Sequence, residues 1–465
     1  MPKAADEIKS FTCSKYIPHT MLVFGKKKTE AALKAAQEQG NQPPQMAQDY
    51  WSIVVRQFSK NRLAVWSLRF FYVILFVGIF ADFIANEKPL YCKVDGQTYF
   101  PVLRQYAVDL GLSSWDEKFI LKRWTDHDYE AVVFPPITYS PTTIDKKNLT
   151  YTSPLKEQKL SPHMRPHYLG TDALGRDVAS GMIHGTRTAM LVGIVSMSIA
   201  TLIGIFLGAL AGYFGDDRLR VSRIRIVLNI LALFVGFFYA FVVRGYAMAD
   251  GINESGLFGE VAITLGIFAL CFVIGNILAI PLKKIPFLGK RVTIAMDMWI
   301  MRFIEVVNSV PVLILILSIV AIIKNPSIMY VMIIIGAVSW TSIAAFIRSE
   351  LLRVRKLEYI EAAQAFGFSE ARIILRHAIP NALTSVLITI AFGVASAILT
   401  ESFLSFIGVG VPAEQVTWGS LLSESREKFD AWWLAVFPGM AIFFTVTIFN
   451  LLGEGLTDAL DPRSK

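Results

Sequence analysis

The sequence predicts an all-α polytopic membrane protein with about eight spans. Of its 465 residues, 54% are hydrophobic and 18% are charged, and the mean hydropathy is +0.49, which is too apolar for an ordinary soluble enzyme. The apolar residues form runs of about 20, the length that an α-helix needs to cross ~30 Å of hydrocarbon, whereas a β-barrel would show short alternating segments. The candidate spans are 65–85, 188–213, 224–243, 260–281, 298–323, 328–347, 382–405 and 432–452.

The short connections between these spans differ in charge. Those on one side of the membrane carry fourteen Lys and Arg residues, and those on the other side carry four. The positive-inside rule therefore predicts that both termini and the loop 348–381 are cytoplasmic. The net charge of +8 reflects this topology, and nucleic-acid binding is a poor explanation for it. The fourteen residues are Arg218, Arg220, Arg223, Arg225, Lys283, Lys284, Lys290, Arg291, Arg348, Arg353, Arg355, Lys356, Arg372 and Arg376.

The spans and their connections divide the chain into six segments. The segment 86–187, which is rich in aromatic residues and proline, is long enough for a small folded subdomain on the periplasmic side. We predict a cytoplasmic tail with an interfacial amphipathic helix (1–64), a first span (65–85), a large periplasmic segment (86–187), a second span (188–215), a segment with two spans (216–295), and a core (296–463) that contains the cytoplasmic loop 348–381.

The loop 348–381 is a polar, helix-forming segment between long apolar runs. Its Glu and Ala residues favour helix, Gly367 allows a turn, and Ser369 can cap a second short helix. The apolar side chains around the turn suit a groove in a partner protein, and a proline ends the segment where the next span begins. This pattern predicts a docking loop, and the alternative is an ordinary cytoplasmic loop with amphipathic helices. The residues that carry the prediction are Glu361, Ala362, Ala363, Phe366, Gly367, Phe368, Ile373, Ile374 and Pro380.

Three charged residues near the inner end of the fifth predicted span are candidates for a gate. A charge at the membrane centre costs about 2.5–3.5 kcal/mol on insertion scales, so we expect Asp297, Arg302 and Glu305 to pair with one another or to face water. A fixed helix end and a gating role are both open. Pro311 lies one to two turns further on, where it can kink the same helix.

Two further sets of residues lie inside the spans. Glu401 and Ser402 are near the outer end of the seventh span, where lining a translocation pathway and ordinary interfacial polarity are the two interpretations. Gly204, Gly208 and Gly212 recur every four residues, which allows helices to approach closely. We interpret the glycines as packing residues.

The sequence shows no site for a nucleotide or a metal. The segments Gly25-Lys26-Lys27 and Gly289-Lys290-Arg291 are the nearest approaches to a phosphate-binding loop, and both lack the following Ser or Thr and the glycine five residues earlier. His163 and His167 are four residues apart, but prolines beside them disfavour a helix, and two ligands alone make a poor zinc site. We therefore expect no catalytic residue, no metal and no cofactor bound by this chain.

Several motifs resemble one protein family. The loop 358–381 resembles the Glu-Ala-Ala loop by which membrane permeases of binding-protein-dependent ABC importers engage their ATPases. Other segments are similar to the permeases of the dipeptide, oligopeptide and nickel branch, and the matches cover most of residues 165–215 and 296–463. These segments are HYLGTDALGRDV at 167–178, GTR at 185–187, LSFIGVGV at 404–411, TWG at 417–419, FPG at 437–439, FNLLGEGL at 449–456 and DALDPR at 458–463.

The resemblance implies a transmembrane permease subunit of an ABC importer, which translocates di- or oligopeptides across the bacterial inner membrane. Its core would be a type I permease of six spans, and residues 216–295 would then be an insertion with two extra spans. Partner subunits would use the ATP and Mg, and residues 361–367 would form the coupling helix that transmits their closure. The implied partners are a second homologous permease, two ABC ATPase subunits, a periplasmic solute-binding protein and the lipid bilayer, with no nucleic acid.

Three alternatives stay open. The same fold can carry nickel, an oligosaccharide or a peptide antibiotic, because selectivity in such systems lies largely in the binding protein. A membrane sensor or scaffold could retain the permease fold without transport. A secondary transporter would need buried carboxylates at mid-span and paired broken helices, and the sequence shows neither clearly.

Overall fold

The computed structural model describes residues 50–160, 162–245, 257–323, 327–410, 412 and 415–460. The chain divides into two units, Met1–Arg56 and Gln57–Lys465, and helix α2 (Tyr50–Phe58) contains the boundary between them. The predicted cytoplasmic tail lies outside the described residues. All elements discussed below belong to the second unit.

Seven helices in the described part of the chain are long and apolar enough to cross a membrane, and a bent helix pair makes an eighth span if the pair is counted as one. The predicted class, an all-α polytopic membrane protein, is therefore confirmed. The helices are α3 (Arg62–Ile79), α7 (Val178–Ala209) with its π-helical continuation η2 (Leu210–Phe214), α8 (Arg223–Phe237) with η3 (Phe238–Val243), α10 (Leu257–Leu282), α14 (Ile328–Val354), α17 (Ile379–Phe406) and α19 (Trp433–Leu460).

The bent pair occupies the place of the span expected at 298–323. Helix α12 (Met296–Asn308) and helix α13 (Val312–Ile322) meet at an angle of 79°. Pro311 occupies the N-cap position of α13, where its missing N–H costs no helical hydrogen bond. The proline therefore separates two helices where the sequence suggested a kink within one.

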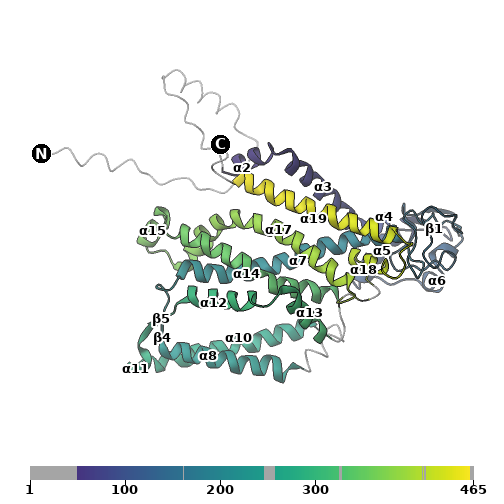
Figure 1. The fold of residues 1–465 in the computed structure, drawn as a ribbon. Coiled ribbons are helices and arrows are strands. Elements are labelled where there is room, and N and C mark those ends of the chain that lie inside the picture. Colours follow the sequence, from purple (N-terminus) through teal and green to yellow (C-terminus); the bar gives the residue numbers. More distant parts are fainter. Residues whose placement is uncertain are drawn as a thin grey trace, which may run out of the picture. The chain divides into compact units, whose positions relative to one another are not determined.

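Helix α7 lies at the centre of the helix bundle in Figure 1, next to α14, α17 and α3, and α19 packs on α17 and α3. Glycines permit the closest of these contacts. A Cβ atom on Gly204 would lie 2.7 Å from Ile343 Cβ, and one on Gly208 would lie 2.6 Å from the carbonyl oxygen of Ala344. One on Gly212 would lie 2.7 Å from the carbonyl oxygen of Arg348. The glycines at every fourth position thus form the surface of α7 that packs on α14.

The two ends of the bundle carry different structures (Figure 1). One end, here called the β1 end, holds a three-stranded antiparallel sheet with strand order β2-β1-β3, packed on an aromatic cluster in which the rings of Phe119 and Trp124 stack at 4.9 Å. The elements here are α4 (Ala81–Ile84), β1 (Tyr91–Val94), β2 (Gln97–Tyr99), α5 (Pro101–Asp109), α6 (Glu117–Leu121), the 3₁₀ helix η1 (Trp124–Asp126), β3 (Ala131–Val133) and α18 (Trp418–Glu424).

The opposite end, here called the α15 end, carries the loop between α14 and α17. It contains α15 (Glu358–Ala365), α16 (Glu370–Ile373) and the π-helical turn η4 (Ile374–Ala378). The same end holds the base of a helical hairpin, in which α8 packs along α10. The hairpin is joined to the bundle through the antiparallel ribbon of β4 (Arg220–Ser222) and β5 (Arg291–Thr293), and α11 (Pro286–Gly289) lies between α10 and β5.

We expect Gly208→Ala to destabilise the protein by about 1–3 kcal/mol, because the new methyl group would overpack the contact between α7 and α14. The matched control is Gly266→Ala on α10, where an added Cβ meets no atom within 4 Å. Thermal unfolding of the detergent-purified variants measures the difference. Equal unfolding midpoints for the two variants would contradict the role given to Gly208.

Candidate functional site

The loop between α14 and α17 turns sharply at Gly367. This residue has a φ of +76°, a left-handed conformation that glycine adopts without the steric cost of a Cβ atom. It follows α15 and separates it from α16. Ser369 occupies the predicted N-cap position of α16, but its side chain makes no capping hydrogen bond.

The two short helices divide their side chains between the protein and solvent. Ile360 and Ile373 are completely buried, whereas Phe366 is 81% exposed and Phe368 is 42% exposed. The prediction that Ile373 offers its side chain to a partner is therefore wrong, because Ile373 packs in the core together with Ile360. Of the other predicted residues, Glu361, Ala362, Gly367 and Pro380 are exposed, Ile374 is half-buried and Ala363 is buried.

Tyr213 connects this loop to the end of α7. Its ring is fully buried, and its hydroxyl donates a hydrogen bond to the Glu370 carboxylate on α16. The same hydroxyl accepts a hydrogen bond at 3.3 Å from the Gln364 amide on α15. Both short helices are thus attached to one side chain of η2. The role of Tyr213 could not be predicted from the sequence, because nothing in its neighbourhood along the chain indicates partners about 150 residues away.

Of the three charged residues on α12, Arg302 and Glu305 pair with each other as predicted, whereas the partner of Asp297 lies on another helix. Asp297 accepts hydrogen bonds from the guanidinium of Arg348 on α14, with 2.7 Å between Oδ2 and Nη2. Arg302 and Glu305 pair with each other at 2.6 Å, with side chains 72% and 57% exposed, and such exposed pairs contribute little to stability. Asp297 therefore joins α12 to α14.

Glu401 and Ser402 are buried between α17 and α18. Ser405 donates a hydrogen bond to Glu401 Oε1 at 2.5 Å, and both predicted residues are almost inaccessible to solvent. A Cβ atom on Gly419 of α18 would lie only 2.3 Å from the carbonyl oxygen of Ser402. In this conformation the two residues belong to a tight helix contact and do not line an open passage.

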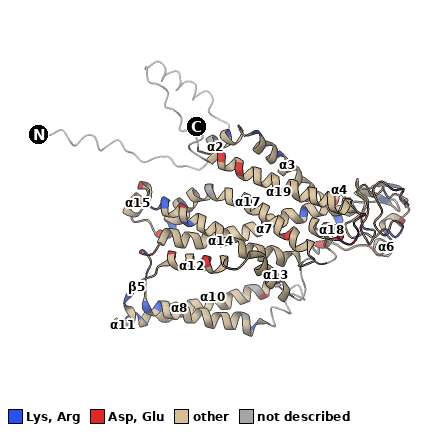
Figure 2. Cartoon of the chain, in the orientation of Figure 1, with Lys and Arg blue, Asp and Glu red and all other residues tan. Residues whose placement is uncertain are grey.

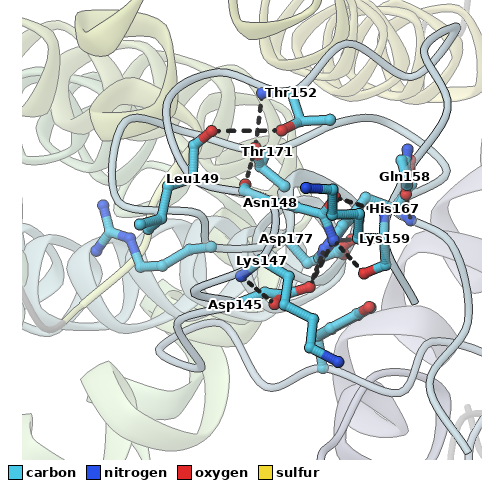
Figure 3. A network of polar contacts seen from close by, with 12 residues as sticks. Asp145, Lys147, Asn148, Leu149, Thr152, Gln158, Lys159, His167, Thr171 and Asp177 are labelled. Carbon is cyan, nitrogen blue, oxygen red and sulfur yellow. Dashed lines mark hydrogen bonds and ion pairs between the residues drawn. The ribbon is translucent and has the colours of Figure 1, made fainter. Parts of the chain in front are cut away.

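A polar network joins the β1 end to the start of α7 (Figure 3). His167 is completely buried, with Nδ1 2.8 Å from Asp177 Oδ2 and Nε2 3.3 Å from Asp145 Oδ2. Asp177 is also the N-cap of α7 and accepts a hydrogen bond from the backbone N–H of Ser180 at 2.6 Å. The ring of Tyr139 stacks on the imidazole at 4.1 Å. His163 lies apart from this network, against Phe134. Among the described residues, no group of three or more His, Cys, Asp or Glu side chains has an arrangement that could hold a metal ion.

A second ion pair network lies beside the first. Arg176 donates hydrogen bonds to Asp172 at 2.5 Å and to Glu424 on α18 at 2.9 Å. The indole N–H of Trp433 donates to the carbonyl oxygen of Thr171 at 3.1 Å. Burial raises the pKa of Glu424 to about 7, with the nearby Asp172 carboxylate acting in the same direction and Arg176 opposing it. Together with Tyr213 at the far end, Asp177 at the start gives α7 a polar attachment at each of its ends.

Two family models match this chain. The model described as binding-protein-dependent transport system inner membrane component matches residues 287–465, which include the loop between α14 and α17. The model described as N-terminal TM domain of oligopeptide transport permease C matches residues 49–101. Neither model covers residues 102–286, which contain β3, α7 and the hairpin of α8 and α10.

Curated relatives extend over more of the chain. The inner membrane ABC transporter permease protein YejE of Escherichia coli is 28% identical over 413 residues, which cover 88% of this chain and 95% of the relative. The peptidoglycan transport system permease protein YejE of Agrobacterium fabrum is 26% identical over 435 residues, with coverages of 88% and 92%. The oligopeptide transport system permease protein OppC of Haemophilus influenzae is 29% identical over 300 residues, with coverages of 64% and 71%.

The fold and these matches define a multi-span permease component of an ABC transporter. Residues 287–465 match the binding-protein-dependent transport system inner membrane component, and relatives similar to most of the chain are permease proteins of ABC transporters. The resemblance that the sequence motifs suggested is confirmed.

The raised pKa of Glu424 predicts a pH dependence of stability. Because the folded state holds the Glu424 proton up to about pH 7 while an unfolded chain releases it near 4.5, the folding free energy from this group becomes less favourable as pH rises between these values. Replacing Glu424 with Gln removes the titration, so we expect the stability of wild type relative to E424Q to fall by up to about 3 kcal/mol across this window.

The measurement is the thermal unfolding midpoint of both proteins in detergent at a series of pH values. Glu427→Gln, which alters a neighbouring exposed carboxylate, is the control. Parallel pH profiles for wild type and E424Q would show that Glu424 does not titrate in this range.

Proposed function

We propose that this chain is one of two permease subunits of an ABC importer that translocates di- or oligopeptides across a bacterial inner membrane. ATP and Mg are used by two partner ATPase subunits, and this chain binds no cofactor. The observation that carries the proposal is the exposed Phe366 on a loop whose two helices are attached through Tyr213 to the central helix α7. The peptide class of cargo is supported by the names of relatives that transport oligopeptides or peptidoglycan.

The orientation follows from charge. Basic residues gather where α15, α11 and β5 lie (Figure 2), so we assign the α15 end and both termini to the cytoplasm. The β1 end then faces the periplasm, where a solute-binding protein delivers cargo. The second, homologous permease completes the pathway within the bilayer.

The mechanism we propose passes from the loop through α7 to the β1 end. Closure of the ATPases moves α15 and α16, and Tyr213 transmits this displacement to α7 because its hydroxyl is bonded to both helices. At its other end, α7 carries Asp177, which holds His167 of the periplasmic segment. A two-state change between inward-open and outward-open forms requires such connected elements. The break at Pro311, with Asp297 fixing α12 to α14, is our candidate for the gate.

A specific alternative concerns the cargo alone. Nickel, an oligosaccharide or a peptide antibiotic would use the same loop and the same helices. Competition for the purified binding protein decides among them. A sensor or scaffold without transport would have no use for an exposed Phe366 on a loop that is hydrogen-bonded to the buried Tyr213.

We expect Phe366→Glu to abolish copurification of the ATPase subunits, because a charge would replace the most exposed apolar side chain of the loop. Phe429→Glu is the matched control, since Phe429 is 90% exposed but follows α18 at the β1 end. The tagged chain is purified from its native membrane in mild detergent, and its partners are identified by mass spectrometry. Retention of the ATPases by F366E, or their absence from wild type, would contradict the proposal.

We expect Tyr213→Phe to reduce transport per ATP hydrolysed while leaving the ATPases bound. A hydrogen bond to a charged group contributes about 1.5–3 kcal/mol, so its loss weakens the connection between the loop and α7 without removing the ring from the core. Tyr330→Phe on α14 is the control, because the Tyr330 hydroxyl forms no hydrogen bond with the described residues. Uptake and ATP turnover are measured together in proteoliposomes, with the KM for ATP. An unchanged ratio of uptake to turnover would exclude this role for Tyr213.

A further inference from the structure

The base of the hairpin of α8 and α10 is strongly basic. Its two segments, residues 216–225 and 283–293, are here called the hairpin base, and they contain eight Lys or Arg residues but only two acidic residues. Most of the basic side chains are exposed. In the described part of the chain, none of the eight forms an ion pair with a carboxylate. The eight are Arg218, Arg220, Arg223, Arg225, Lys283, Lys284, Lys290 and Arg291.

The ribbon of β4 and β5 places part of this charge on one face. Arg220 lies opposite Thr293, and Ser222 lies opposite Arg291. Because opposite residues and residues two apart share a face of an antiparallel pair, two guanidinium groups and two hydroxyl groups gather on the same side. The hydroxyl of Ser222 is buried, with the residue only 7% exposed, and it has no hydrogen-bond partner in the described structure. This face therefore offers two exposed guanidinium groups, which recognise a phosphate, together with the exposed Thr293.

Apolar side chains accompany the charge. Phe287 is 72% exposed and Ile285 is 45% exposed, and both lie between Lys284 and Lys290 in the sequence. The guanidinium of Arg223 is 5.3 Å from the centre of the Phe287 ring. Exposed aromatic residues flanked by basic residues are typical of segments at a membrane interface.

The position of the hairpin base is fixed by the helices it joins. The ribbon leads directly into α8, and α10 ends at Leu282, next to Lys283. Both helices are candidate membrane spans, so the hairpin base lies at the depth of the lipid headgroups. Figure 2 shows Lys and Arg at this end of α8 and α10. We propose that the hairpin base binds the phosphate headgroups of anionic phospholipids.

If these basic residues served only to orient the chain in the membrane, they would not need to share one face of the ribbon. An exposed Phe287 beside them would not be needed either. The bound lipid would act on the same part of the bundle as the loop between α14 and α17. The backbone N–H of Met298 donates to Asp216 Oδ1 at 3.1 Å, and Tyr213 is three residues before Asp216. Headgroup binding is measured directly, so this proposal does not rest on the transport function.

The test uses the purified full-length chain, stripped of lipid and titrated with phosphatidylglycerol or phosphatidylcholine, with bound lipids counted by native mass spectrometry. The variant carries Lys283→Gln, Lys284→Gln, Lys290→Gln and Arg291→Gln. Each basic residue near an anionic surface changes affinity by about fivefold, so we expect at least about tenfold weaker binding of phosphatidylglycerol. Phosphatidylcholine binding should be unchanged, and added salt should weaken phosphatidylglycerol binding to wild type.

Two further variants make the result decisive. Changing Lys122, Lys146, Lys147 and Lys156 to Gln removes the same charge from the β1 end and should leave lipid selectivity intact. Replacing Lys283, Lys284 and Lys290 with Arg should preserve binding and show that charge at the hairpin base is the requirement. Equal loss in the β1-end variant would assign the effect to net charge and overturn the proposal. Unchanged phosphatidylglycerol binding in the Gln variant would also overturn it.

Discussion

The close contact between α7 and α14 is the constraint on which the rest of the structure depends. Gly204, Gly208 and Gly212 leave no room for a Cβ atom, so the two helices approach closely over about two turns. In a bilayer this packing matters more than in water, because lipid tails are as apolar as the side chains and give helices little other reason to associate. The contact holds α7 in the middle of the bundle, where it reaches both ends of the protein.

Polar groups at the two ends of α7 connect this central helix to segments at both ends of the protein. At the α15 end the buried Tyr213 hydroxyl serves two short helices at once. At the β1 end Asp177 caps α7 and also holds the buried His167. Buried polar groups are costly unless they are paired, so a displacement that breaks either attachment is unfavourable. Movement of the whole helix, with both attachments intact, is the less costly response to a force on the loop.

The helices of the hairpin, α8 and α10, pack mainly on each other and expose apolar surfaces. Polar contacts between them include the amide pair of Asn276 and Asn229 at 2.9 Å. Both keep large apolar side chains exposed along their outer surfaces. Such a pair is stable in the membrane beside the bundle, because lipid tails contact the exposed apolar side chains. Only the short ribbon needs to join it to η2 and α12.

Properties that are local in the chain could be read from the sequence. The length of the apolar runs determined that the protein is a helical membrane protein. The basic loops predict its orientation. The composition of residues 358–381 indicated a turn at Gly367, which the φ of +76° bears out. Motifs within single segments were sufficient to identify the family, because each depends on residues that are adjacent in the chain.

Contacts between distant segments were decided only by the tertiary structure. The sequence suggested that Asp297 pairs with its neighbours on the same helix, whereas its partner Arg348 comes from α14. The sequence pattern predicted that Ile373 contacts a partner protein, whereas its side chain is completely buried in the core. It gave no reason to single out Tyr213 at all. Periodicity shows that a helix has an apolar face but not which helix covers it, and a charge or hydroxyl finds its partner only when packing brings two remote segments together.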